Sequence, residues 1–154
     1  MGPFAEVCHA HSAVTALTRP AHAAAARRTP TVVTRAFPGE PGSLRLARRF
    51  MVEALAGTAH ERRADDVSLV VTELAANAIT HASSPFVVGA SLLNGQVRLW
   101  VRDGSASPPA RRRSSASSEG GRGLALVDGV ADRWGHEAVD GGKVVWAAFG
   151  EPAS

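Results

Sequence analysis

The sequence of 154 residues lacks the features that cross-link a chain or attach it to a membrane. It contains one cysteine, Cys8, so no disulfide can form within it, and its cysteine and histidines do not have the spacing of a zinc site. Its uninterrupted apolar runs are far shorter than the roughly 18 residues that a membrane-spanning helix needs. The N-terminal region has no basic stretch followed by an apolar run, so we expect no secretory signal. These absences predict a domain held by its core, in the reducing cytoplasm and without a membrane partner.

Lysine is almost missing as well. Of the 17 basic residues all but Lys143 are arginine, a bias typical of a GC-rich coding sequence. The formal net charge is only +3, because 14 acidic residues are interspersed among the basic ones. Such a small excess is weak support for a nucleic-acid partner, and we expect no direct one.

The length and the 45% of hydrophobic residues suffice for one ordinary globular domain. Residues 1–29 are rich in Ala, His and Arg and have no helical or strand period, which predicts a flexible extension. The alternative is an ordered segment that packs on the domain or on a partner. We therefore expect a domain over residues 30–150, followed by a short tail at 151–154.

Within the domain, hydrophobic periodicity and turn residues predict helices and strands in the order β-α-α-β-β-loop-α-β-β. The second helix has two possible starts, a capping box at Thr58 and Glu61 or the acidic pair at 65–66. Three tryptophans are expected in the core. The order predicts an α+β fold, a two-layer sandwich of one mixed, mostly antiparallel sheet with about three helices on one face. The first half is expected to hold a strand at 31–37, a helix at 43–57 and a second helix that ends near residue 82. The expected elements after it are a hairpin of 86–93 and 96–103 joined by Asn94-Gly95, a polar loop at 104–123, a helix from Leu124 to near Trp134-Gly135, and a hairpin of 136–139 and 143–149.

One face of the second helix carries polar groups at four-residue spacing. Glu73, Asn77 and His81 stack along one side, apart from the apolar stripe. A carboxylate and a carboxamide one turn apart suit Mg²⁺, which binds few protein oxygens together with phosphates and water. The alternative is that these residues form an ordinary solvated helix face. For His81, at the C-terminal end of the helix, we expect a favourable interaction with the helix dipole rather than metal binding.

Glycines precede the third predicted helix, in the stretch Gly120-Gly121-Arg122-Gly123. Glycines let the backbone approach an anion, the first amide groups of a helix attract phosphate, and Arg122 can add a charged contact. The pattern is typical of a phosphate seat and equally of a flexible hinge.

Asp103 ends a predicted strand and is followed by Gly104. A carboxylate in this position can accept a hydrogen bond from a planar amino group such as that of adenine, and Gly104 lets the ring lie close. An ordinary Asp-Gly turn is the competing interpretation.

Taken in order, these segments resemble the N, G1 and G2 boxes of the ATPase fold shared by gyrase, histidine kinases and the anti-sigma serine kinases. The resemblance is closest to the short anti-sigma regulatory factors abundant in actinobacteria. It covers roughly residues 31–149. The three segments are LVVTELAANAITHA at 69–82, VRDG at 101–104 and GRGLALVD at 121–128.

The resemblance implies a Bergerat-type ATP-binding fold that uses ATP and Mg²⁺. Asn77 would ligate Mg²⁺, and Glu73 would act as the catalytic base or position water. Asp103 and Gly104 would bind adenine. The residues implied at the phosphates are Gly121, Arg122, Gly123 and Leu124.

The predicted function is an anti-sigma-type serine/threonine protein kinase. By the resemblance, it would sequester a sigma factor, phosphorylate a STAS-domain antagonist and form a homodimer. Two departures from the wider family favour the alternative, a non-catalytic ATP-binding or partner-binding module: SASPP follows Gly104 where a second glycine is usual, and the lid at 111–118 lacks a second phosphate-binding lysine. A detached histidine-kinase catalytic half is disfavoured, because no helix with a phosphoacceptor histidine is predicted before residue 31.

Overall fold

The computed structural model describes residues 29–93, 95–109 and 123–150. The predicted extension at 1–29, apart from its last residue, lies outside the described residues. So do the tail at 151–154 and most of the polar loop, including Gly121 and Arg122.

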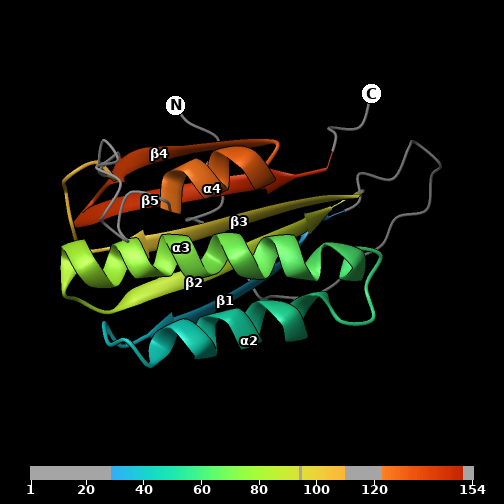
Figure 1. The fold of residues 1–154 in the computed structure, drawn as a ribbon, viewed down its shortest axis with the longest axis horizontal. Helices are drawn as coiled ribbons and strands as arrows, with labels where there is room; N and C mark the ends of the chain where they lie inside the picture. The colour runs from blue at the N-terminus through green and yellow to red at the C-terminus, as the bar shows by residue number, and fades with distance from the viewer. Residues whose placement is uncertain (1–28, 94, 110–122, 151–154) are drawn as a thin grey trace, which may run out of the picture.

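The described residues form two layers, a sheet of five strands and three α-helices that cover one of its faces (Figure 1). The strand order is β1-β2-β3-β5-β4, and every neighbouring pair is antiparallel. The predicted α+β sandwich is confirmed, with a sheet that is antiparallel throughout rather than mixed. The elements are β1 (Thr31–Phe37), α2 (Ser43–Leu55), η2 (Glu61–Arg63, a 3-10 turn), α3 (Ala64–Ala82), β2 (Phe86–Leu93), β3 (Gln96–Asp103), α4 (Gly123–Val130), β4 (Arg133–Val139) and β5 (Gly142–Phe149).

The core lies between the sheet and the helices. Apolar residues at three- and four-residue intervals give α2 and α3 one buried stripe each, as an amphipathic helix packed on a sheet requires. The strands alternate, so that every second residue of β2, β3 and β5 enters the same core. These stripes confirm the two helices that the hydrophobic periodicity predicts. Their buried members are Ala47, Phe50, Met51 and Leu55 on α2, and Val67, Val70, Val71, Leu74 and Ala78 on α3.

The junction between α2 and α3 settles where α3 begins. The hydroxyl of Thr58 donates to the Leu55 carbonyl at 2.7 Å and accepts the His60 N–H at 3.1 Å, while the Gly57 N–H donates to Glu61 Oε2 at 3.3 Å. Thr58 and Glu61 therefore stabilise the loop ahead of η2. Helix α3 starts at Ala64, so the acidic pair at 65–66 lies in its first turn. Negative charge there interacts favourably with the helix dipole.

The predicted end of the last helix near Trp134 is wrong. Helix α4 ends at Val130, and Trp134 lies in β4. The cause is Asp132, whose N–H donates to the Ala148 carbonyl at 3.0 Å and whose Oδ2 accepts the Gly150 N–H at 2.6 Å. These contacts bind the chain to the β5 end of the sheet directly after the helix.

The tryptophans pack on both faces of the sheet. Trp134 packs against the main core, while Trp100 forms a second, smaller buried cluster with Val144, against which Trp146 packs. The expectation that all three tryptophans lie in the core is met in part: Trp100 is buried in the second cluster, whereas Trp134 and Trp146 are only partly buried. Of the helices described, none combines the length and apolar character needed to cross a bilayer.

Candidate functional site

Several of the elements that carry predicted site residues meet at one end of the sandwich (Figure 1). Helix α3 leads into β2 through the short segment 83–85, so its last turns lie near the beginning of β2. Because β2, β3 and β5 are antiparallel neighbours, the end of β3 and the beginning of β5 share this edge. Helix α4 packs beside α3.

Glu73 and the first residue of α4 are in close approach. A Cβ atom built on Gly123 would lie 2.7 Å from Glu73 Oε2, closer than real side chains come. A residue larger than glycine at this position therefore displaces the carboxylate. The structure thus joins two of the three motifs on which the resemblance rests, the helical N-box segment and the glycine-rich segment.

Asn77 lies one turn after Glu73 on the same side of α3. It is half-buried, and its Nδ2 atom is fully buried with no hydrogen-bond partner among the described residues. Leaving a buried polar group unpaired costs about 1–3 kcal/mol, so such a group calls for a functional explanation. A half-turn of the amide exchanges Nδ2 with Oδ1 and presents an oxygen in the same place. An amide oxygen in this position is a suitable ligand for a hydrated cation.

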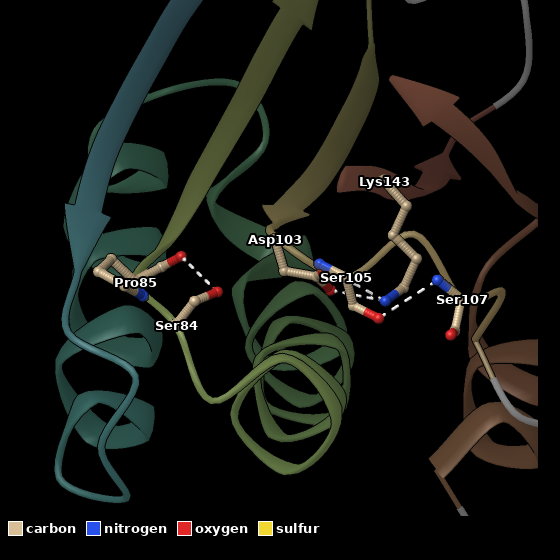
Figure 2. Close-up of polar contacts among 6 residues, drawn as sticks. All are labelled: Ser84, Pro85, Asp103, Ser105, Ser107 and Lys143. Carbon is tan, nitrogen blue, oxygen red and sulfur yellow. Dashed lines mark hydrogen bonds and ion pairs between the residues drawn. The ribbon is translucent and has the colours of Figure 1, made fainter. Parts of the chain in front are cut away.

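Asp103 is buried at the end of β3 and already has partners (Figure 2). Lys143 Nζ lies 3.0 Å from Oδ1 and 2.9 Å from Oδ2, and the Ser105 N–H donates to Oδ1 at 2.8 Å. Lys143, the second residue of β5, lies directly opposite Asp103, since the two are Cα partners in the ladder. The predicted adenine-binding carboxylate is therefore held in place from two sides.

Sequence reasoning missed Lys143. The signal was present, because it is the single lysine of the chain and sits next to a turn at the start of a strand. Its partner could not be found without the register of β3 and β5.

The segments around Asp103 fit together closely. A Cβ on Gly142 would lie 1.8 Å from the Asp103 carbonyl oxygen, so only glycine fits at the start of β5. A Cβ on Gly104 would lie 2.9 Å from Ser84 Oγ, which brings the loop before β2 to the same place. After Gly104 the chain turns through two local bonds, the Asx bond of Ser105 and a bond from the Ser107 N–H to Ser105 Oγ at 3.3 Å (Figure 2).

Of the remaining predicted site residues, the structure describes Leu124 and His81. Leu124 is buried in the first turn of α4, where it is 6% exposed. His81 is exposed in the last turn of α3, as a helix-dipole role requires. Gly121 and Arg122, together with the predicted lid at 111–118, lie outside the described residues, so their roles stay predictions.

The donor set fits Mg²⁺ bound together with phosphates. No three His, Cys, Asp or Glu side chains gather into a metal site in the described part of the chain. Mg²⁺ needs no such cluster when phosphate oxygens and water complete its shell. A single amide oxygen from Asn77, beside the carboxylate of Glu73, is then an adequate protein contribution.

Comparison with known proteins adds one match. The family model described as the histidine kinase-like ATPase domain matches residues 37–149, nearly three quarters of the chain. This stretch contains Glu73, Asn77, Asp103, Gly123 and Lys143. No curated protein matches the chain significantly.

Proposed function

Because the chain belongs to the histidine kinase-like ATPase domain family, we propose that it binds Mg·ATP between α3 and α4 and transfers the terminal phosphoryl group to a protein hydroxyl. The observation that supports this most directly is the approach of Gly123 to Glu73 Oε2. It brings an acid of α3 to the first residue of a helix whose amide groups are suited to phosphate.

In this proposal each residue has one task. Asn77 supplies its amide oxygen to Mg²⁺, which when bound neutralises charge on the phosphates. The first turn of α4, which begins at Gly123, offers backbone N–H groups to the phosphates. Asp103 accepts a hydrogen bond from the amino group of adenine.

Glu73 acts as the general base. As the hydroxyl oxygen of the target forms its bond to the γ-phosphorus, the bond from that phosphorus to the β,γ-bridging oxygen breaks and ADP leaves. The hydroxyl proton passes to the Glu73 carboxylate. Catalysis of this kind consists mainly of positioning and charge stabilisation, so a short list of residues is sufficient.

The target and partner are proposed from the resemblance to anti-sigma regulatory factors. The substrate would be a serine or threonine of a STAS-domain antagonist, and the sequestered partner a sigma factor. A homodimer is part of the same proposal.

Titration calorimetry of Mg·ATP tests the site. We expect Asn77→Ala to weaken binding at least about tenfold, the effect of a lost metal ligand or its support. Thr80→Ala is the matched control, because Thr80 is exposed on the same helix, and it should bind as the wild type does. Equal affinity of Asn77→Ala and wild type in the presence of Mg²⁺ would refute the proposed site.

A phosphotransfer assay tests the reaction itself. Labelled γ-phosphate should reach a cognate antagonist with the wild type and fall about 100-fold or more with Glu73→Gln, which keeps the shape of the side chain but not the base. Transfer that persists in Glu73→Gln would contradict the role of Glu73.

A second candidate is a regulatory module that binds nucleotide or partner without turnover. The stretch SASPP at 105–109 favours it, because the wider family has a second glycine there in its adenine-binding box. Nucleotide binding with no transfer to any tested antagonist, alongside tight association with a sigma factor, would decide for this candidate over the kinase.

A further inference from the structure

Resting on the proposed nucleotide site, we propose that Lys143 is a specificity-determining residue for the base. It orients Asp103 and places an N–H donor beside the carboxylate acceptor. Together they recognise a base edge that carries an amino donor next to a ring-nitrogen acceptor, as adenine does.

The pair is built into the sheet. Asp103 and Lys143 are direct Cα partners on β3 and β5, and the ammonium nitrogen lies within 3.0 Å of both carboxylate oxygens (Figure 2). Their residues are only 4% and 3% exposed. The strands fix both backbones, so the carboxylate has little freedom to rotate.

Counting hydrogen bonds shows what is left over. Among the described residues Oδ1 accepts from both Lys143 and Ser105, while Oδ2 lies 2.9 Å from Lys143 Nζ in the ion pair. An ammonium group has three donors, and its contacts with Asp103 occupy at most two of them. Within the part of the chain that the structure describes, this leaves acceptor capacity on Oδ2 and at least one donor on Nζ for a ligand.

Stability alone does not explain this pair. Burying two charges costs several kcal/mol of desolvation per ion, and well-packed apolar residues of similar volume are often as stable or more so. The chain nevertheless buries its single lysine here, while its other 16 basic residues are arginine. A compact ammonium with a spare donor fits a recognition role.

The proposal predicts a defined preference among purines. The amino group of adenine donates to Oδ2 and its neighbouring ring nitrogen accepts from Nζ. Hypoxanthine presents a carbonyl oxygen and an N–H in these places, so it sets acceptor against acceptor and donor against donor. The Lys143 and Asp103 side chains are only 3% and 2% exposed, so a base that binds them meets a partly desolvated site where such a mismatch is costly.

The experiment compares Mg·ATP with Mg·ITP by titration calorimetry in the full chain. We expect the wild type to prefer ATP by about 100-fold, the discrimination of a good bidentate contact. Lys143→Met keeps the length of the side chain and removes the donor. The preference should then drop to about tenfold or less, mainly through weaker ATP binding.

A second variant covers the case in which Lys143→Met does not fold. Asp103→Asn combined with Lys143→Met removes both charges together, and its carboxamide can turn to accept either base edge. Its preference for ATP over ITP should be close to one. Thermal melting confirms that each variant is folded before titration.

The outcomes separate the two proposals. If the wild type binds neither nucleotide, the proposed function fails and this inference fails with it. If the wild type prefers ATP and the folded Lys143→Met protein loses affinity for both nucleotides equally, Lys143 is a structural residue and the inference alone is overturned. A lowered preference in both variants supports it.

Discussion

One row of side chains crosses the helix-facing side of the sheet, and its two halves have opposite chemistry. On β1 and β2, Phe37 faces Phe86 with ring centroids 5.6 Å apart, and Phe50 of α2 closes the cluster at 6.1 Å from Phe37. On β3 and β5 the same row continues with Asp103 facing Lys143, one residue beyond the Val87 to Arg102 pair.

The comparison separates stabilisation from recognition. The aromatic half buries large apolar surfaces under α2, which is favourable in itself. The charged half occupies an equivalent place beside α3 and α4, where apolar side chains would fit a stable fold at least as well. The sequence therefore gives up stability on the side of the row where the nucleotide is proposed to bind.

The aromatic half should carry the largest effect on stability. Phe86 is 1% exposed, and Phe86→Ala should lower the free energy of unfolding by about 3–5 kcal/mol because it leaves a cavity in the core. Urea denaturation measures the change. Phe86→Leu fills most of the volume and should cost clearly less. A loss below about 1 kcal/mol for Phe86→Ala would show that the aromatic cluster is not what holds this edge together.

In the charged half, removing one partner should be costly and removing both should not. Asp103→Leu leaves the Lys143 ammonium buried without a counter-charge, which should cost about 3 kcal/mol. Asp103→Leu with Lys143→Met should recover most of this loss, up to or above wild-type stability. Denaturation of the two single variants and the double variant gives the coupling energy. A double variant as unstable as either single variant would mean that the pair is a structural necessity, and the contrast with the aromatic half would disappear.

Local signals predicted much of the fold. The hairpin of β2 and β3 was expected at its observed bounds, because strand alternation and the Asn94-Gly95 turn lie within one short stretch. The end of α4 was wrong because the bonds of Asp132 to Ala148 and Gly150 join parts of the chain far apart in sequence. No local pattern contains that information.

The site divides in the same way. Glu73, Asn77 and Asp103 are predicted as site residues from spacing and from motif order, and these roles stay predictions. The partner of Asp103 was not found, because Lys143 is 40 residues further on and becomes its neighbour only through strand pairing. The contact of Gly123 with Glu73 depends likewise on how α4 packs beside α3.

A smaller expected effect, on activity rather than stability, tests the glycine that meets Glu73. Gly123→Ala should displace the Glu73 carboxylate, since the new Cβ would lie 2.7 Å from Oε2. A shift of about 1 Å can cost about 100-fold in rate, so phosphoryl transfer should fall by that order while stability changes by under about 1 kcal/mol. Gly129→Ala is the matched control, because the space around Gly129 is open within 4 Å and the helix gains a better former. Equal activity of the two variants would remove Gly123 from the site.

The smallest effect is expected at the exposed counterpart of the buried pair. Arg49 and Glu53 lie one turn apart on α2 with Nε 2.7 Å from Oε1, close to the Lys143–Asp103 distances, yet their side chains are 75% and 54% exposed. Water and salt screen such a pair, so Arg49→Ala should cost about 0.3–0.5 kcal/mol at low salt and almost nothing at about 1 M salt. Arg48→Ala, exposed on the same helix, controls for helix propensity, and urea denaturation at both salt concentrations measures the difference.

Breaking the buried pair should cost several times more and respond little to salt, because burial removes both the screening and the water that would replace a lost partner. Similar costs and similar salt responses at the two pairs would mean that water reaches Asp103 and Lys143 freely, and a desolvated recognition site could not exist there.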